Sequence, residues 1–230
     1  VTMQADPAPP VRTYEIGPIP LGMELDKVSQ VVITSQSPAQ ALVLSSRLNR
    51  ISRFDLSTGQ QTTTVDGIPD RFEICDVSPD GKQVVLVGED VTSGNVVRVQ
   101  ALQKDADSAT LQPFPDRYDK PVWAGFTNDG GLLVMNGSGV LRKLRLPGGE
   151  QVYEVKVRRH HPVLSPGRKY VVCMSSRPHV IEVATGKLLG VLPSPYQGTD
   201  LHIEVRSVAF HPAGRRLAAL MRGKRGPRVG

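Results

Sequence analysis

The sequence predicts an all-β fold, a β-propeller of four-stranded antiparallel blades. The first observation behind this prediction is a turn signal of the Ser-Pro-Asp-Gly kind, which recurs along the 230 residues with a short apolar run after each copy. The second is another repeated signal between these turns, an alternating strand that ends in small residues and usually a glycine. Helical periodicity is missing, and four-stranded units of about 40 to 50 residues around a common axis are the propeller arrangement.

The clearest copy of the turn is Ser78-Pro79-Asp80-Gly81. Proline fixes φ at about −65°, aspartate accepts hydrogen bonds from the backbone ahead of it, and glycine adopts positive φ without steric cost. The segment 84–87 is apolar and mostly β-branched, which is typical of a buried strand, and 72–77 on the other side is another short strand-like segment. Together they predict a β-hairpin.

The other copies predict the remaining blades in chain order. Further turns are expected at 37–40, 127–130, 165–168 and 211–214. Third strands with their glycine turns are expected at 51–60, 141–150 and 179–188. The stretch that begins "NVVRVQALQ" fills this place in the second repeat and has lost the glycine. A fourth strand follows in each repeat, so the chain holds four full repeats and a partial fifth.

Residues 28–230 carry the repeats, and residues 1–27 are rich in proline and polar residues. We predict that residues 1–27 are either a linker or an N-terminal closing strand. The fifth unit supplies two strands, so we expect the chain to be part of a larger ring. The alternative is that residues 11–21 close the ring as an outer strand.

Three stretches, "VSPDGKQVVLV", "FDLSTGQ" and "VATGKLLGVL", resemble WD40-type repeats, in particular the divergent PD40, TolB and YVTN kind. The resemblance covers residues 28–230 and implies a propeller whose loops bind other molecules. The Gly-His pair of WD40 repeats is missing. Their Trp-Asp pair is replaced by Phe54-Asp55, Leu144-Arg145 and Ile181-Glu182.

Composition limits the kinds of partner. The chain has 28 basic and 22 acidic residues, a net charge of +6, with basic clusters at 156–161 and 222–228. We interpret both clusters as solvated loops, because aromatic side chains do not alternate with the charges as they do in stacking platforms. We therefore expect no nucleic acid partner. A membrane-spanning helix is not expected either, since no apolar run approaches about 18 residues.

Residues that could carry catalysis or bind metal are scarce. Cys75 and Cys173 lie far apart without metal-ligand spacing and are predicted to be buried thiols. The adjacent His160 and His161 would point to opposite faces of a strand, so they do not predict a metal site. The GxSxG and HExxH motifs are absent. We expect no enzyme activity, no metal and no cofactor.

The loops between blades are the remaining candidates for function. By the resemblance, the segments 113–121, 158–162 and 193–202 lie on one face, and they contain aromatic and arginine side chains typical of interface anchors. The predicted function is a non-catalytic scaffold that presents these loops to a protein or peptide. The alternatives are a propeller enzyme, either a hydrolase or quinoprotein-like, and a ligand-sensing domain of a larger multidomain protein. The candidate partner-binding residues are Phe114, Arg117, Tyr118, Arg159 and Tyr196.

Overall fold

The computed structural model describes residues 28–34, 39–45, 48–68, 71–103, 108–116, 118–157, 162–174, 178–191, 201–211 and 216–225. Within these ranges the chain is all-β, with eighteen strands and no helix. The segment 1–27, predicted to be a linker or a closing strand, lies outside the described residues.

Sixteen strands form four antiparallel four-stranded sheets, each ordered as in the chain. Blade 1 consists of β1 (Val28–Ile33), β2 (Gln40–Ser45), β3 (Arg50–Asp55) and β4 (Gln61–Asp66). Blade 2 consists of β5 (Phe72–Val77), β6 (Gln83–Asp90), β7 (Gly94–Ala101) and β8 (Ser108–Leu111). Blade 3 consists of β9 (Pro121–Phe126), β10 (Leu132–Asn136), β11 (Val140–Arg145) and β12 (Glu150–Lys156). Blade 4 consists of β13 (Pro162–Leu164), β14 (Tyr170–Cys173), β15 (His179–Glu182) and β16 (Leu188–Val191). The partial blade 5 consists of β17 (Leu201–Phe210) and β18 (Leu217–Arg225).

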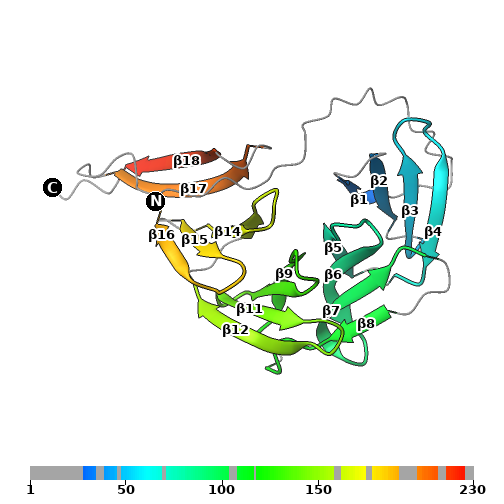
Figure 1. The fold of residues 1–230 in the computed structure, drawn as a ribbon, viewed down its shortest axis with the longest axis horizontal. Helices are drawn as coiled ribbons and strands as arrows, with labels where there is room; N and C mark the ends of the chain where they lie inside the picture. The colour runs from blue at the N-terminus through cyan, green and yellow to red at the C-terminus, as the bar shows by residue number, and fades with distance from the viewer. Residues whose placement is uncertain are drawn as a thin grey trace.

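The blades follow one another in an arc, from blade 1 in blue and cyan to blade 5 in orange and red (Figure 1). The first strand of a blade lies toward the inside of the arc and the fourth toward the outside, as β9 and β12 show (Figure 1). Neighbouring blades meet through their inner strands, because β9 contacts β5 and β6, and β1 contacts β5. The predicted fold class, a β-propeller of four full repeats and a partial fifth, is confirmed for the described strands.

The recurring turn is closed by a hydroxyl side chain. The backbone N–H of Gln83 donates to the Ser78 hydroxyl oxygen at 2.9 Å. This bond secures the start of the second strand of blade 2. Equivalent bonds run from Gly131 to Thr127 at 3.0 Å and from Tyr170 to Ser165 at 3.0 Å.

The aspartate of the turn acts through geometry, as predicted. Asp80 accepts hydrogen bonds from the Ser78 hydroxyl at 2.6 Å and from the Lys82 N–H at 3.1 Å. These two bonds, the Ser78 bond first, hold the pKa of Asp80 below its usual value. Gly81 completes the turn with φ of 66°, a conformation that side chains disfavour.

Blade 2 buries both of its faces, one against blade 1 and the other against blade 3. Alternate residues of a strand point to opposite sides, and β7 illustrates the consequence. Val96 joins a buried cluster with Leu42 and Leu44 of blade 1. Val97 and Val99 join the cluster that includes Phe126 and Leu132 of blade 3. A blade therefore cannot bury its apolar surface alone, which is why the unit repeats.

The two cysteines are free thiols in the core, Cys173 completely buried and Cys75 partly buried. Burial raises the pKa of Cys173 to about 12 and that of Cys75 to about 11. We therefore expect both thiols of the folded chain to react with iodoacetamide at pH 8 at least about 100-fold more slowly than in the unfolded chain, because the thiolate is the reactive form. Alkylation followed by mass spectrometry, with and without urea, measures this ratio. Equal rates in the two states would contradict the burial of the thiols.

Candidate functional site

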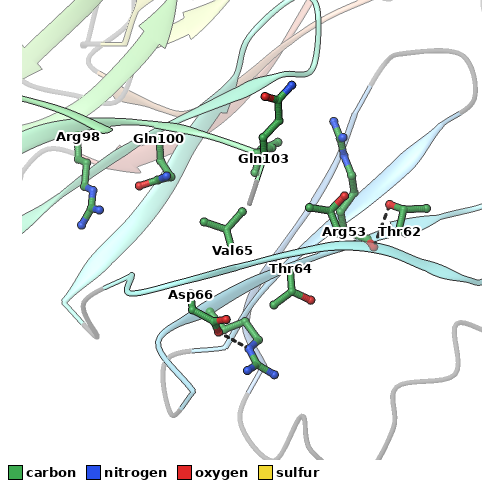
Figure 2. A pocket seen from close by; sticks show the side chains of 11 residues that line it. Arg53, Thr62, Thr64, Val65, Asp66, Arg98, Gln100 and Gln103 are labelled. Atoms are coloured by element: carbon green, nitrogen blue, oxygen red, sulfur yellow. Dashed lines mark hydrogen bonds and ion pairs between the residues drawn. The ribbon is translucent and has the colours of Figure 1, made fainter. Parts of the chain in front are cut away.

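A polar groove lies between blade 1 and blade 2 (Figure 2). It has a volume of about 860 Å³, within the range of ligand-binding pockets. One wall is the outer strand β4, and the other is β7 with the residues that follow it. The lining residues are Arg50, Arg53, Thr62, Thr63, Thr64, Val65, Asp66, Arg98, Gln100, Leu102 and Gln103.

The next pair of blades provides an internal comparison. Blades 2 and 3 enclose a groove of about 370 Å³, and its lining contains no charged side chain. Val99 of β7 and Leu146, which follows β11, are among its apolar lining residues. The size and the charge of the groove between blades 1 and 2 are therefore not a general consequence of the repeat.

Strand register identifies Gln100 as the polar exception at a repeated apolar position. In each complete blade one residue at the start of the second strand closes the recurring turn through its backbone. The residue directly after it is Ala41, Val84, Leu132 and Val171 in blades 1 to 4. The third-strand residues paired with these four are Phe54, Gln100, Leu144 and Ile181. All four are buried, and only the glutamine is polar.

Only one of the two polar atoms of the buried Gln100 amide has a hydrogen-bond partner. The side chain is 4% exposed and its NH₂ group donates to the carbonyl oxygen of Ala101 at 3.2 Å. Its carbonyl oxygen Oε1 has no hydrogen-bond partner. A buried acceptor without a partner costs about 1–3 kcal/mol. This side chain therefore weakens the fold at a position where an apolar residue would fit.

Two arginines of the groove retain unused donors. Arg53 donates from Nη2 to the carbonyl oxygen of Gly81, and Arg98 donates from Nη1 to the carbonyl oxygen of Gly67 at 3.4 Å. A guanidinium has five N–H donors, and the buried Nε atoms of both side chains have no partner. Figure 2 shows Arg98 and Gln100 on one side of Val65 and Arg53 on the other.

The charge of the groove is positive. Three arginines face one aspartate in the lining. Asp66 forms an ion pair with Arg50 at 2.6 Å, and in the described part of the chain neither Arg53 nor Arg98 has a carboxylate partner. Burial lowers the pKa of the Arg53 guanidinium below its usual value, which reflects a charge desolvated without compensation.

Arg142 occupies the same place in the repeat as Arg98, but its charge has a carboxylate partner. Arg98 pairs with Leu86 in blade 2, and Arg142 pairs with the equivalent residue Val134 in blade 3. The Arg142 side chain forms an ion pair with Glu154 at 2.8 Å and lies 4.7 Å from the centre of the Phe114 ring. Arg142 is thus compensated by its own surroundings, whereas Arg98 is not.

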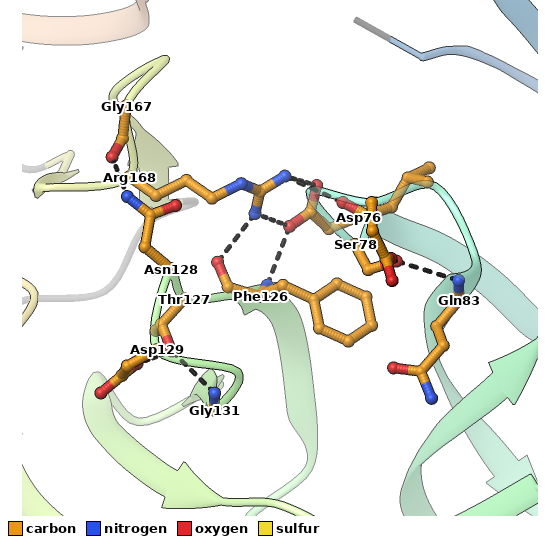
Figure 3. Close-up of polar contacts among 12 residues, drawn as sticks. Asp76, Ser78, Gln83, Phe126, Thr127, Asn128, Asp129, Gly131, Gly167 and Arg168 are labelled. Atoms are coloured by element: carbon orange, nitrogen blue, oxygen red, sulfur yellow. Dashed lines mark hydrogen bonds and ion pairs between the residues drawn. The ribbon is translucent and has the colours of Figure 1, made fainter. Parts of the chain in front are cut away.

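A second polar cluster lies on the inner strands and joins three blades (Figure 3). Arg168, in the turn between β13 and β14, forms a bidentate ion pair with Asp76 of β5, including a bond of 3.0 Å from Nη2 to Oδ1. Its guanidinium also donates to the carbonyl oxygens of Phe126 at 2.7 Å and Val77 at 2.8 Å. Asp76 further accepts the N–H of Phe126 at 2.8 Å. The two charges satisfy each other, so this cluster stabilises the arrangement of the blades.

Arg168 occupies the turn position that Gly81 fills in blade 2. It adopts φ of 53°, which is unfavourable for a residue with a side chain. The arginine at a glycine position was the sequence signal for this cluster, and reasoning from the sequence did not use it.

The loop 113–121 holds the two described members of the predicted partner-binding set. The side chain of Phe114 is 5% exposed and belongs to the core between blades 2 and 3, so the expectation that it is an exposed anchor was wrong. Tyr118 is 75% exposed. The loop is held by Asp116, which accepts the N–H of Tyr118 at its carboxylate and the N–H of Asp119 at its carbonyl, both at 2.9 Å.

The other three predicted residues, Arg117, Arg159 and Tyr196, lie outside the described residues, as do His160 and His161. The groove residues Arg53, Arg98 and Gln100 were missed. A signal for Gln100 was present, because it stands where other repeats carry the first residue of the degenerate Trp-Asp pair.

The described residues contain no group of three or more histidine, cysteine, aspartate or glutamate side chains arranged to hold a metal ion. They also contain no helix that could cross a membrane.

Comparisons with known proteins give the fold and no activity. No protein-family model matches the chain, and no curated protein sequence matches it. Among solved structures 1026 chains are similar, so the fold is a common one. One is a chain of Kuenenia stuttgartiensis hydrazine synthase, with a TM-score of 0.56 and 18% sequence identity; the match covers 82% of this chain and 54% of that one. The chain thus spans about half of this neighbour, and at such low identity the likeness shows a shared propeller-like fold alone.

Proposed function

We propose that this chain is a non-catalytic β-propeller module that binds a protein or peptide. The observation that carries the proposal is the contrast between the two polar clusters. The Asp76–Arg168 cluster satisfies its own charges, whereas the groove between blades 1 and 2 keeps buried polar atoms without partners. Buried polar groups are normally paired, and unpaired ones that line a groove are open to an ordered water or a bound molecule.

The loop 113–121 supports the same function on a second surface. Its inner end is anchored by the buried Phe114, and Asp116 orders the turn that displays Tyr118. A tyrosine held on an ordered loop loses little conformational entropy on binding, and tyrosine is enriched among interface anchors. The loop therefore presents one large side chain in a nearly fixed position.

An enzyme is the second candidate, an alternative that the fold likeness to a chain of hydrazine synthase leaves open. The described acids near the turns, Asp80 and Asp129, are engaged by local partners: Asp80 by Ser78, and Asp129 by Lys143 at 2.7 Å. These bonds hold the pKa values of both carboxyls below their usual range, which suits structural acids better than general acids. We therefore place the binding module first.

Selection from a random peptide library displayed on phage tests the proposed function. The immobilised chain is expected to enrich peptides that bind it again as synthetic peptides in solution. An unrelated β-propeller of similar size and charge serves as the control. If no peptide is enriched above that control, the chain is not a peptide-binding module of the kind proposed here.

Tyr118→Ala is expected to weaken the binding of peptides or proteins that use the loop 113–121 by about 2 kcal/mol, the scale of an interface anchor. The melting temperature is expected to change little, because the side chain is 75% exposed. Val91→Ala, which shortens a fully exposed side chain on a turn of blade 2, is the control. A fall in melting temperature with unchanged binding would make Tyr118 a structural residue.

A further inference from the structure

We propose that the groove between blades 1 and 2 binds an acidic peptide segment in extended conformation, along the outer edge of β4, which has no second partner among the described strands. This inference rests on the proposed function and names the site and the chemistry of its ligand. Three features carry it: an open strand edge, two uncompensated arginines along that edge, and a buried amide with an unused acceptor.

The edge of β4 is suited to accept another strand. β4 is the last strand in the sheet of blade 1, and it pairs only with β3 among the described strands. Thr62, Thr63 and Thr64 form its centre and line the groove, and threonine has high β-propensity. An extended peptide that pairs with such an edge gains backbone hydrogen bonds, while pockets on alternate sides read its side chains.

The two arginines are spaced along this edge. Arg53 lies opposite Thr63 on β3, and Arg98 donates to the carbonyl oxygen of Gly67, which directly follows β4. Position 67 is four positions beyond Thr63, and an added strand advances about 13 Å over four positions. Residues four positions apart in an added strand face the same side. The groove therefore fits a peptide with two acidic side chains four positions apart.

Carboxylates are the chemical class that the two arginines favour. A guanidinium binds a carboxylate through two parallel N–H donors, and partial desolvation strengthens such a pair. Arg53 and Arg98 each use one donor on a backbone carbonyl and have donors left. Between them, Val65 and Leu102 provide an apolar floor on which uncharged side chains of the peptide can rest.

Gln100 adds a hydrogen-bond acceptor to the site. Its Oε1 has no partner, at a position that is apolar in the other three complete blades. A small rotation of the side chain would turn this oxygen to a peptide N–H and remove the penalty of an unpaired buried acceptor. The glutamine thus weakens the free protein at the place where a bound peptide would supply the missing donor.

The probe is a short, blocked peptide of threonine and valine with two glutamates four positions apart and a fluorophore at one end. Binding to the whole chain is measured by fluorescence anisotropy. We expect saturable binding that weakens at least about tenfold when both glutamates become glutamine. A peptide with the glutamates three positions apart, on opposite faces, is also expected to bind weakly. Equal binding of all three peptides would overturn the proposal.

Arg53→Gln and Arg98→Gln remove the charges and keep polar, though shorter, side chains. Each is expected to weaken binding of the acidic probe at least about tenfold and to leave the glutamine probe unaffected. Arg145→Gln is the matched control, since Arg145 is 70% exposed and pairs with Glu150 outside the groove. Circular dichroism checks that each variant is folded. Loss of probe binding in the control to the same extent would point to general charge attraction and overturn the site.

Gln100→Leu restores the apolar residue of the other blades. We expect a higher melting temperature, because an unpaired buried acceptor is removed, together with weaker binding of the acidic probe. A stabilised variant that binds the probe as well as the native chain would exclude Gln100 from the site. This variant remains informative if an arginine variant fails to fold.

Competition separates the inference from the proposed function. Free glutamate and inorganic phosphate are expected to displace the probe only at far higher concentrations than an unlabelled peptide. Displacement at equal concentrations would mean that the groove takes a free anion, which overturns the peptide assignment. Another outcome is that the selected library peptides bind although none of them is acidic and none loses affinity for the Arg98→Gln variant. In that case the assignment of the ligand to this groove fails, and the proposed binding function stands.

Discussion

Asp76→Asn is expected to lower the free energy of unfolding by about 3 kcal/mol, because it leaves the charge of Arg168 uncompensated in a largely buried site. The side chains of Asp76 and Arg168 are only 20% and 17% exposed. Asparagine keeps the shape of aspartate, but its NH₂ group would face either the Phe126 N–H or the guanidinium, both of which are donors. Urea denaturation followed by circular dichroism measures the loss.

The control is an ion pair of the same type on the surface. Glu150→Gln breaks the pair between Glu150 and Arg145, whose side chains are 67% and 70% exposed. Its expected effect is within about 0.5 kcal/mol, because solvent already screens the two charges. Similar losses in both variants would contradict the structural role of the Asp76–Arg168 cluster.

A double substitution separates the pair from its components. Asp76→Leu combined with Arg168→Met removes both charges, so the combined loss is expected to be smaller than the sum of the two single losses. The coupling arises because each single variant leaves the other charge buried without a partner. Additive losses would mean that the two residues act independently. The pair connects blade 2 to blade 4, so its loss is expected to loosen the arrangement of the blades before the strands within them.

Leu133→Ala is expected to cost about 3 kcal/mol, through lost apolar burial and the cavity left behind. Leu133 lies on β10, is completely buried, and belongs to the cluster between blades 3 and 4. Val152→Ala on β12 is the control, since that side chain is 49% exposed and its expected effect is below about 0.5 kcal/mol. Urea denaturation compares the two variants. A loss below about 1 kcal/mol in Leu133→Ala would show that blade 4 does not pack firmly on blade 3.

These variants also bear on how the module would bind. A propeller fixes its loops and grooves because each blade is held by its neighbours. The groove between blades 1 and 2 is built from two separate sheets, and Gln30 also joins these sheets by bonding both the N–H and the carbonyl oxygen of Ile74. A ligand in the groove would contact both blades and is expected to stabilise them together, which raises the melting temperature with the logarithm of the ligand concentration relative to Kd.

The sequence by itself determined the strands, the turns and their repetition. The segment 72–77, predicted as a strand, is β5 with the same bounds, and the fifth unit has the two expected strands in the described residues. These features depend on local chemistry: proline and glycine restrict backbone angles, aspartate and serine bond to nearby N–H groups, and alternating side chains define the two faces of a strand. Each can be inferred from a few neighbouring residues.

Only the tertiary structure decided which faces meet and which side chains are satisfied. Phe114 looked like an exposed anchor in a loop, yet it is buried beneath Arg142 from the next blade. Arg168 and Asp76 meet across 92 residues of chain, and Arg53 and Arg98 border one groove although they come from different blades. The physical reason is that the alternation of a strand shows which residues share a face but not what lies opposite that face. Burial and pairing depend on contacts between blades, and those contacts form only when the blades pack.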